Sequence, residues 1–304
     1  MKENILELNK LSKKIGNKSI IDNVSIEVKK GEIFGLVGPN GSGKTTLIRM
    51  IVGLISKSEG QIKFNGEDVS NNINKVLDKI GVIIENPDMY PYLSGYMNLY
   101  LFSKMSLNDI DKERVDLILK KCGLDEVKFN KVKTYSLGMR QRLGIAQALV
   151  HDPNLIILDE PTNGLDPSGI LELRDYLKEL KSSGKSIVIS SHLLSEMQLI
   201  CDRAAFLEKG KVVKVVDLNN KTSLFNYKEF IVDKAEEAAH ILEKNSIEYK
   251  YINEENIQIS IDQEAIPDII TLLNNSGVRV YYIKDLVVQL EEEYFNIKQV
   301  EGLA

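Results

Sequence analysis

Residues 35–46 read GLVGPNGSGKTT and contain the spacing G-x-x-x-x-G-K-[ST], which runs from Gly38 to Thr45. This spacing is typical of a loop whose consecutive backbone N–H groups wrap a polyphosphate, and glycine is favoured there because side chains would obstruct the close approach. Lys44 supplies a positive charge for the terminal phosphates, and Thr45 supplies a hydroxyl for Mg²⁺. The pattern therefore predicts a site for a nucleoside triphosphate with magnesium.

The residues on either side of the loop favour a strand before it and a helix after it. Residues 32–37, EIFGLV, form a short apolar run, and Leu47, Ile48 and Ile51 recur at helical spacing. The positive end of such a helix would face the same phosphates. A surface Gly-Ser turn, the alternative interpretation, requires neither the buried strand nor the amphipathic helix.

The overall composition excludes several classes of protein. The chain has 304 residues, 43% of them hydrophobic, which suits two domains with a sizeable core. The net charge is −5 with acids and bases interspersed, so we expect no nucleic-acid partner. No apolar run reaches 18 residues, so nothing is expected to span a membrane. We expect a protein of the cytoplasm that would act at a membrane only through a partner's helices.

Buried strands alternate with helices along the first two thirds of the chain. The runs 79–84, 155–160 and 185–192 read as buried strands, which predicts an α/β domain with a parallel sheet. Residues 4–8 and 20–28 alternate between apolar and polar, as in antiparallel strands with one face in water. Ligands of such sheets gather at the carboxyl ends of the parallel strands.

A polar segment at residues 217–224 predicts a boundary between two domains. We place the domains at residues 1–218 and 219–304, with a helical subdomain at about residues 86–150 of the first. The second domain follows a βαββαβ order with a closing helix, which resembles a small α+β ferredoxin-like unit. Its sequence contains no nucleotide or metal motif.

Three titratable residues follow the predicted central strands. Asp159 and Glu160 end the run LIILDE, where a carboxylate can hold Mg²⁺ through water and the next can polarise an attacking water. Buried acids are costly without a cation, which argues against an ordinary solvated turn. His192 follows the run 185–191 and could reach the same water. A purely structural histidine is the alternative interpretation.

A second anion-binding helix start is predicted at residues 135–142, YSLGMRQR. Ser136 and Gly138 open a long helix there, and a helix start with a hydroxyl and a glycine suits an anion. One domain with two phosphate-directed helix ends suggests that two copies share nucleotides across an interface.

Taken together, these motifs resemble the ATP-binding subunit of an ABC transporter, a P-loop NTPase, over residues 1–216. GPNGSGKT resembles the Walker A motif, LIILDE the Walker B motif with its catalytic glutamate, and YSLGM the family signature. Residues 163–166 resemble the D-loop, and His192 resembles the switch histidine. The resemblance implies an ABC ATPase fold of parallel sheet, antiparallel β subdomain and helical subdomain.

The resemblance also implies a set of functional residues and partners. Two subunits, expected to be copies of this chain, would bind ATP and Mg²⁺ between them and drive separate transmembrane permease subunits on the inner face of the membrane. The residues expected to contact the nucleotide are Gly38, Pro39, Asn40, Gly41, Ser42, Gly43, Lys44, Thr45, Thr46, Ile15, Ser136, Gly138 and Asp166. The catalytic residues are expected to be Glu160, His192, Lys44 and Glu85, and the metal-binding residues Thr45, Asp159 and Glu85.

The sequence departs from the family pattern at three places. Leu137 and Met139 replace a glycine and the usual glutamine of the signature, while its phosphate-facing pair remains. Ile15 stands where an aromatic residue usually stacks on adenine, so base affinity is expected to rest on apolar packing alone. Glu85 stands where the family normally has the Q-loop glutamine.

The glutamate at position 85 and the residues after it are similar to the ATPases of bacitracin-resistance and lantibiotic-immunity exporters. This similarity implies efflux of antimicrobial peptides, with antibiotic resistance or immunity as the outcome. An exporter ATPase for a lipid or a small-molecule drug is the alternative, since the cassette would be the same. A soluble ABC ATPase that acts without a transporter is a further alternative, although this chain has neither a second cassette nor a long inserted coiled coil.

Overall fold

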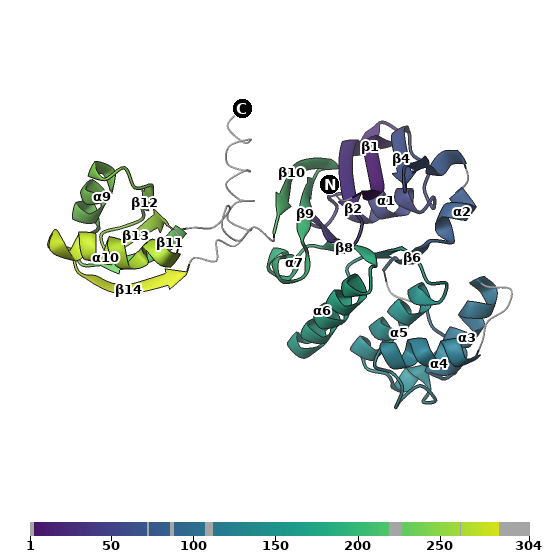
Figure 1. Ribbon diagram of the computed structural model, residues 1–304. Helices are drawn as coiled ribbons and strands as arrows, with labels where there is room; N and C mark the ends of the chain where they lie inside the picture. The colour runs from purple at the N-terminus through teal and green to yellow at the C-terminus, as the bar shows by residue number, and fades with distance from the viewer. Residues whose placement is uncertain are drawn as a thin grey trace. The chain divides into compact units, whose positions relative to one another are not determined.

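The computed structural model describes residues 3–71, 73–85, 88–106, 112–218, 227–261 and 263–285. The chain divides into two compact units, Met1–Asp217 and Leu218–Ala304, whose helices and strands are labelled in Figure 1. The first unit contains the phosphate-loop pattern, so its central sheet decides how the site is built.

A six-stranded sheet forms the centre of the first unit, in the order β10-β9-β3-β8-β7-β6. Its strands are β3 (Ile33–Val37), β6 (Ile80–Ile83), β7 (Leu155–Leu158), β8 (Ser186–Ser191), β9 (Arg203–Glu208) and β10 (Lys211–Asp217). All neighbouring pairs are parallel except β9 and β10, which form an antiparallel hairpin. Every residue of β3, β7 and β8 is buried, as their apolar sequences predict. The parallel sheet is confirmed, and the carboxyl ends of these strands meet at one edge.

An antiparallel sheet lies beside α1 (Lys44–Ile51) and has the order β2-β1-β4-β5. Its strands are β1 (Asn4–Ile15), β2 (Lys18–Lys29), β4 (Glu59–Phe64) and β5 (Glu67–Asp68). The strands β1 and β2 are longer than the predicted runs because their register shifts keep the apolar face on the core. Figure 1 shows β1, β2 and β4 gathered around α1.

Three helices form a subdomain with an apolar core of its own. They are α3 (Gly95–Ser106), α4 (Lys112–Lys121) and α5 (Leu137–Leu149), and Figure 1 shows them side by side. Leu99, Leu119 and Leu143 meet in this core, each at most 1% exposed. Gly123, at φ 67°, ends α4 as the sequence predicts, and the next amide returns to the carbonyl of Leu119.

The remaining helices of the first unit are α2 (Ile73–Leu77), α6 (Pro167–Ser182) and α7 (Leu194–Ile200). Asp166 caps the start of α6 and Pro167 occupies its first position, which fixes where this helix begins. The sequence did not predict α2 and α7, which have five and seven residues. Helices this short show too few apolar repeats for periodicity to detect.

The second unit contains the elements β11 (Tyr227–Val232), α9 (Ala235–Lys244), β12 (Tyr249–Tyr251), β13 (Asn256–Ser260), α10 (Ile266–Asn275) and β14 (Val280–Asp285). Its antiparallel sheet has the order β12-β13-β11-β14, which confirms the predicted βαββαβ, ferredoxin-like arrangement. Phe230, Leu242 and Leu273 are fully buried in its core. The predicted closing helix at residues 285–297 lies almost wholly outside the described residues.

Candidate nucleotide site

The loop between β3 and α1 contains glycines that the surrounding protein itself requires. A Cβ atom at Gly38 would lie 2.2 Å from the carbonyl oxygen of Leu207 on β9. Gly43 has φ 110°, and a Cβ atom there would lie 2.6 Å from the Cδ1 atom of Ile21. The sequence assigned these glycines to the approach of a phosphate. The structure adds a second reason for glycine at these positions, because residues of β2 and β9 lie too close to the loop to leave room for a Cβ atom.

The start of α1 leaves donors available for an anion. Gly43 precedes the helix in the left-handed conformation, and no side chain caps the N-terminus. The hydroxyl of Ser42 is buried, with the residue 3% exposed, and it has no hydrogen-bond partner among the described residues. A buried hydroxyl without a partner is costly, so an oxygen of a bound ligand would satisfy it. The loop thus offers a site for phosphate on observations independent of its sequence pattern.

The remaining residues of the loop lie where they can contact the same ligand. Pro39 and Asn40 are exposed, Thr45 and Thr46 are half-buried in the first turn of α1, and Gly41 is exposed. Ile15, at the end of β1, is 58% exposed.

Lys44 connects the loop to Glu160, the glutamate that the sequence predicts to be catalytic. Its Nζ atom donates hydrogen bonds to the carbonyl oxygens of Gly38, at 2.7 Å, and Pro39, at 3.3 Å. The same atom lies 3.2 Å from Oε1 of Glu160, and the lysine side chain is 6% exposed. A buried ammonium needs such acceptors, and a phosphate oxygen would be a further one.

The two acids after β7 are held by a serine of the neighbouring strand. Asp159 is 2% exposed, and its Oδ1 atom accepts a 2.5 Å hydrogen bond from the hydroxyl of Ser190. The same hydroxyl accepts a 2.8 Å hydrogen bond from the backbone N–H of Glu160. Glu160 has φ 48°, a conformation that costs energy for a residue with a side chain and that is common at functional sites. Ser190 therefore holds the carboxylate of Asp159 and the backbone of Glu160.

His192 completes a row of three charged or polar side chains. Its Nδ1 atom lies 2.8 Å from Oε2 of Glu160, whose other oxygen faces Lys44. The backbone N–H of His192 lies 3.4 Å from the same Oε2 atom. The order Lys44–Glu160–His192 therefore brings together three of the four predicted catalytic residues.

The fourth predicted residue, Glu85, contacts a partner that the sequence analysis missed. Its Oε1 atom lies 2.6 Å from the Nη2 atom of Arg49, which is in the last turn of α1. Glu85 follows β6 with φ 64°, and its side chain is 67% exposed. Arg49 lies five residues after Lys44, so α1 contains both the lysine of the phosphate loop and the cation that contacts Glu85. Nothing in the local sequence pattern pairs these two residues, because the contact spans 36 positions.

Ser136, Gly138 and Asp166 line a different cavity, of about 370 Å³, that contains no residue of the phosphate loop. Ser136 caps α5 by accepting a hydrogen bond from the N–H of Met139. Asp166 caps α6, and hydrogen bonds from the Ser168 hydroxyl and the Gly169 N–H lower the pKa of its carboxyl. These residues thus form a second polar surface on the same unit, apart from the loop.

A magnesium ion fits the loop as part of a nucleotide complex. The described residues contain no group of three or more His, Cys, Asp or Glu that could hold a metal by itself. Mg²⁺ usually keeps several waters and takes one or two protein oxygens with substrate phosphates. The Thr45 hydroxyl in the first turn of α1 and the buried Asp159 carboxylate supply such oxygens.

The comparisons with known proteins agree with this geometry. The family model described as ABC transporter matches residues 21–163. The chain is 43% identical over 296 residues to the ABC transporter ATP-binding protein YhcH of Bacillus subtilis, covering 96% of this chain and 95% of that protein. It is 35% identical to the bacitracin transport ATP-binding protein BcrA of Enterococcus faecalis, over 99% of both chains. It is 42% identical to the lantibiotic transport ATP-binding protein SrtF of Streptococcus pyogenes, over 73% of this chain and 96% of that one.

A solved structure shares the fold of the first unit at 27% identity. It is the dimeric, post-hydrolysis state of the ATP-binding cassette MJ0796 bound to ADP and phosphate, with a TM-score of 0.63 over 70% of this chain and 98% of that one. The phosphate loop, the buried acids after β7 and the near full-length relatives lead to one conclusion. The chain belongs to the ATP-binding subunits of ABC transporters, and it is an ATPase that binds and hydrolyses ATP.

Proposed function

We propose that the protein is the motor of an ABC exporter, in which two copies of the chain bind ATP and Mg²⁺ between them and drive efflux through separate membrane subunits. The observation that supports this most directly is the row Lys44–Glu160–His192 at the phosphate loop, with Ser136 and Gly138 on a separate cavity. The row at the phosphate loop of one copy and the Ser136–Gly138 surface of a second copy would together complete one site.

The hydrolytic step assigns a role to each side chain. Glu160 accepts a proton from the attacking water, and His192, 2.8 Å away, orients the Glu160 carboxylate and contacts the same water. The ammonium group of Lys44 exchanges its hydrogen bonds to the carbonyl oxygens of the loop for hydrogen bonds to the terminal phosphates. Thr45 and Asp159 would hold Mg²⁺, which would neutralise phosphate charge. Ser190 keeps Glu160 in its uncommon backbone conformation throughout.

Dimerisation would place the signature of one copy over the phosphate loop of the other. The start of α5, with Ser136 and Gly138, supplies donors and a positive helix end for the γ-phosphate. Asp166, whose capping hydrogen bonds lower the pKa of its carboxyl, lines the same cavity. The dimeric cassette among the related structures supports the formation of a dimer.

An exposed apolar cluster on the helical subdomain suits a membrane-protein partner. Tyr92 is 63% exposed, Phe129 71% and Met105 79%. Ring contacts join Tyr90 to Tyr92 and Tyr96 to Phe129, so the exposed side chains form groups. Clustered aromatic and methionine side chains are typical of protein-binding surfaces. No helix in the described ranges combines the length and apolar character needed to cross a bilayer. We propose that the protein is cytoplasmic and binds permease subunits at the inner face of the membrane.

The transported cargo is proposed to be an antimicrobial peptide of the bacitracin or lantibiotic kind. BcrA and SrtF, named for bacitracin and lantibiotic transport, support this choice. The resemblance of Glu85 and the residues after it to such ATPases points the same way. An exporter of a lipid or a small-molecule drug remains the second candidate, because the cargo contacts the membrane subunits.

The proposal is tested by deleting the gene and measuring resistance to bacitracin and a lantibiotic. We expect resistance to fall and to return with the intact gene but not with Glu160→Gln. We also expect a polytopic membrane protein to co-purify with the tagged chain in detergent. Unchanged resistance to both peptides would contradict the cargo, and absence of a membrane partner would contradict the transporter role.

The Arg49–Glu85 pair gives a separate prediction. Glu85→Gln removes a charge from an exposed ion pair, so we expect ATP affinity and folding stability to change by less than about 1 kcal/mol, while coupling of hydrolysis to peptide resistance changes. Arg49→Gln tests the same contact from the other side. In a double-mutant cycle, the effects of both changes on peptide resistance should be non-additive. Additive effects would show that the pair does not act as a unit. The control is Lys57→Gln, a half-buried lysine that contacts Ser70 and neither member of the pair.

A further inference from the structure

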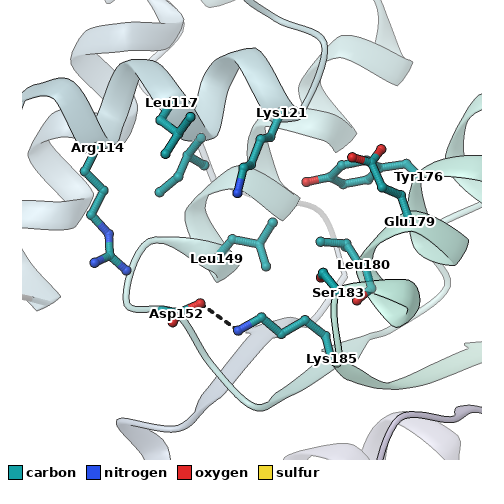
Figure 2. Close-up of a pocket in the computed structure, with 11 residues that line it drawn as sticks. Arg114, Leu117, Lys121, Leu149, Asp152, Tyr176, Glu179, Leu180, Ser183 and Lys185 are labelled. Atoms are coloured by element: carbon teal, nitrogen blue, oxygen red, sulfur yellow. Dashed lines mark hydrogen bonds and ion pairs between the residues drawn. The ribbon is translucent and has the colours of Figure 1, made fainter.

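A cavity of about 310 Å³ lies between two helices that face each other in the first unit (Figure 2). One wall is the stripe Arg114, Leu117, Ile118 and Lys121 of α4. The other wall is the stripe Tyr176, Glu179 and Leu180 of α6, continued by its C-cap residue Ser183. Both stripes have the spacing of a single helix face, so each helix presents one continuous surface to the cavity. The volume is at the lower end of the range for small-molecule sites.

The inside of the cavity is apolar. Leu117 is 52% exposed, and Ile118, Leu149 and Leu180 line the space beside it. Figure 2 shows Leu149 between the two walls, with the Tyr176 ring on the side of α6. The Tyr176 hydroxyl lies 3.0 Å from the Sγ atom of Cys122, so its polar end already has a partner. Hydrocarbon surface that remains open to solvent here would be covered by an apolar ligand.

The rim of the cavity has more positive than negative charge. Asp152 is paired with Lys185 at 2.6 Å, as the dashed line in Figure 2 marks. A hydrogen bond from Lys185 is the main cause that lowers the pKa of the Asp152 carboxyl, and the charges of Arg114 and Lys121, seven residues apart on α4, lower it further. Glu179 on α6 offsets one of these two charges. The lining therefore has three cations and two anions, a balance that favours a ligand with a single negative charge.

We propose that this cavity binds a small amphipathic anion, whose hydrocarbon body contacts Leu117, Leu149 and Leu180 and whose anionic group contacts Arg114 and Lys121. The ligand class follows from the apolar walls together with two cations on one edge. A bound molecule would connect α4 of the helical subdomain to α6, the helix that Asp166 begins. Binding there would thus link the helical subdomain to α6, whose first turn lines the polar cavity with Ser136.

The test uses octanoate as the probe and the full-length protein with labelled isoleucine and leucine methyl groups. We expect octanoate to shift the methyl signals of Leu117, Ile118, Leu149 and Leu180 with a dissociation constant of about 1 mM, as ten non-hydrogen atoms permit. Leu8 and Ile26 of the antiparallel sheet should not shift. Octylamine, with the same chain and a positive charge, should bind at least about tenfold more weakly than octanoate.

The double variant Arg114→Gln, Lys121→Gln separates charge recognition from apolar contact. We expect it to weaken octanoate binding about tenfold and to leave the binding of neutral octanol unchanged. The matched control is Lys120→Gln, which removes a lysine from the same helix outside the lining. The proposal would be overturned if the wild type bound octanoate and octylamine with equal affinity. It would also be overturned if about 10 mM octanoate, ten times the expected dissociation constant, left the cavity methyl signals unshifted.

Discussion

Replacing Glu160 with glutamine is expected to lower ATP hydrolysis by about a hundredfold to ten-thousandfold while ATP binding is retained. Glutamine has the shape of glutamate but cannot accept a proton, and general-base catalysis contributes about this much to such reactions. In the structure, one oxygen of Glu160 faces Lys44 at 3.2 Å and the other faces His192 at 2.8 Å. The amide oxygen can keep the contact with Lys44, so the phosphate loop should remain formed.

The same variant should accumulate a dimer in the presence of ATP, because a bound nucleotide that is not split holds the two copies together. Phosphate release measures the first effect, and light scattering with and without ATP measures the second. Glu67→Gln, an exposed change on β5, is the matched control and should leave both unchanged. Hydrolysis at the wild-type rate by Glu160→Gln would remove the general-base role from this residue.

The sequence was sufficient to predict most of the fold, because the relevant signals are local. Four apolar residues before Asp159 predict a buried strand, which the structure contains as β7. The alternation of residues 20–28 predicts an antiparallel strand, which lies within β2. Short elements such as α2 and α7 were not predicted, since one or two helical turns leave little periodic signal.

The contacts that hold the site together could not be predicted in the same way. Arg49 meets Glu85 across 36 residues, and Ser190 meets Asp159 across 31. Such contacts depend on which strands become neighbours, and a single sequence does not encode that order in any local pattern. A weak signal was present for Ser190, a polar residue near the end of an otherwise apolar strand at the edge where parallel strands place ligands. The cavity between α4 and α6 had no such signal, because its two walls are apart in sequence.

Replacing Lys44 with alanine is expected to weaken ATP binding by about a hundredfold to a thousandfold. The Nζ atom is a buried charged donor, and hydrogen bonds to charged groups contribute about 1.5–3 kcal/mol each. Two such bonds to the terminal phosphates would account for the expected loss, since about 1.4 kcal/mol corresponds to a factor of ten in affinity. Titration with a fluorescent ATP analogue measures the dissociation constant directly.

The variant also changes the nucleotide-free protein, because Lys44 holds the carbonyl oxygens of Gly38 and Pro39 and faces Glu160. Removing one partner of a largely buried ion pair leaves the other without compensation, so thermal stability should fall as well. Lys44→Ala combined with Glu160→Gln separates the two effects. The double variant should regain part of the lost stability, since no uncompensated carboxylate remains, but it should not regain ATP affinity. Recovery of ATP binding in the double variant would show that Lys44 acts through the charge of Glu160 and not through contact with the phosphates.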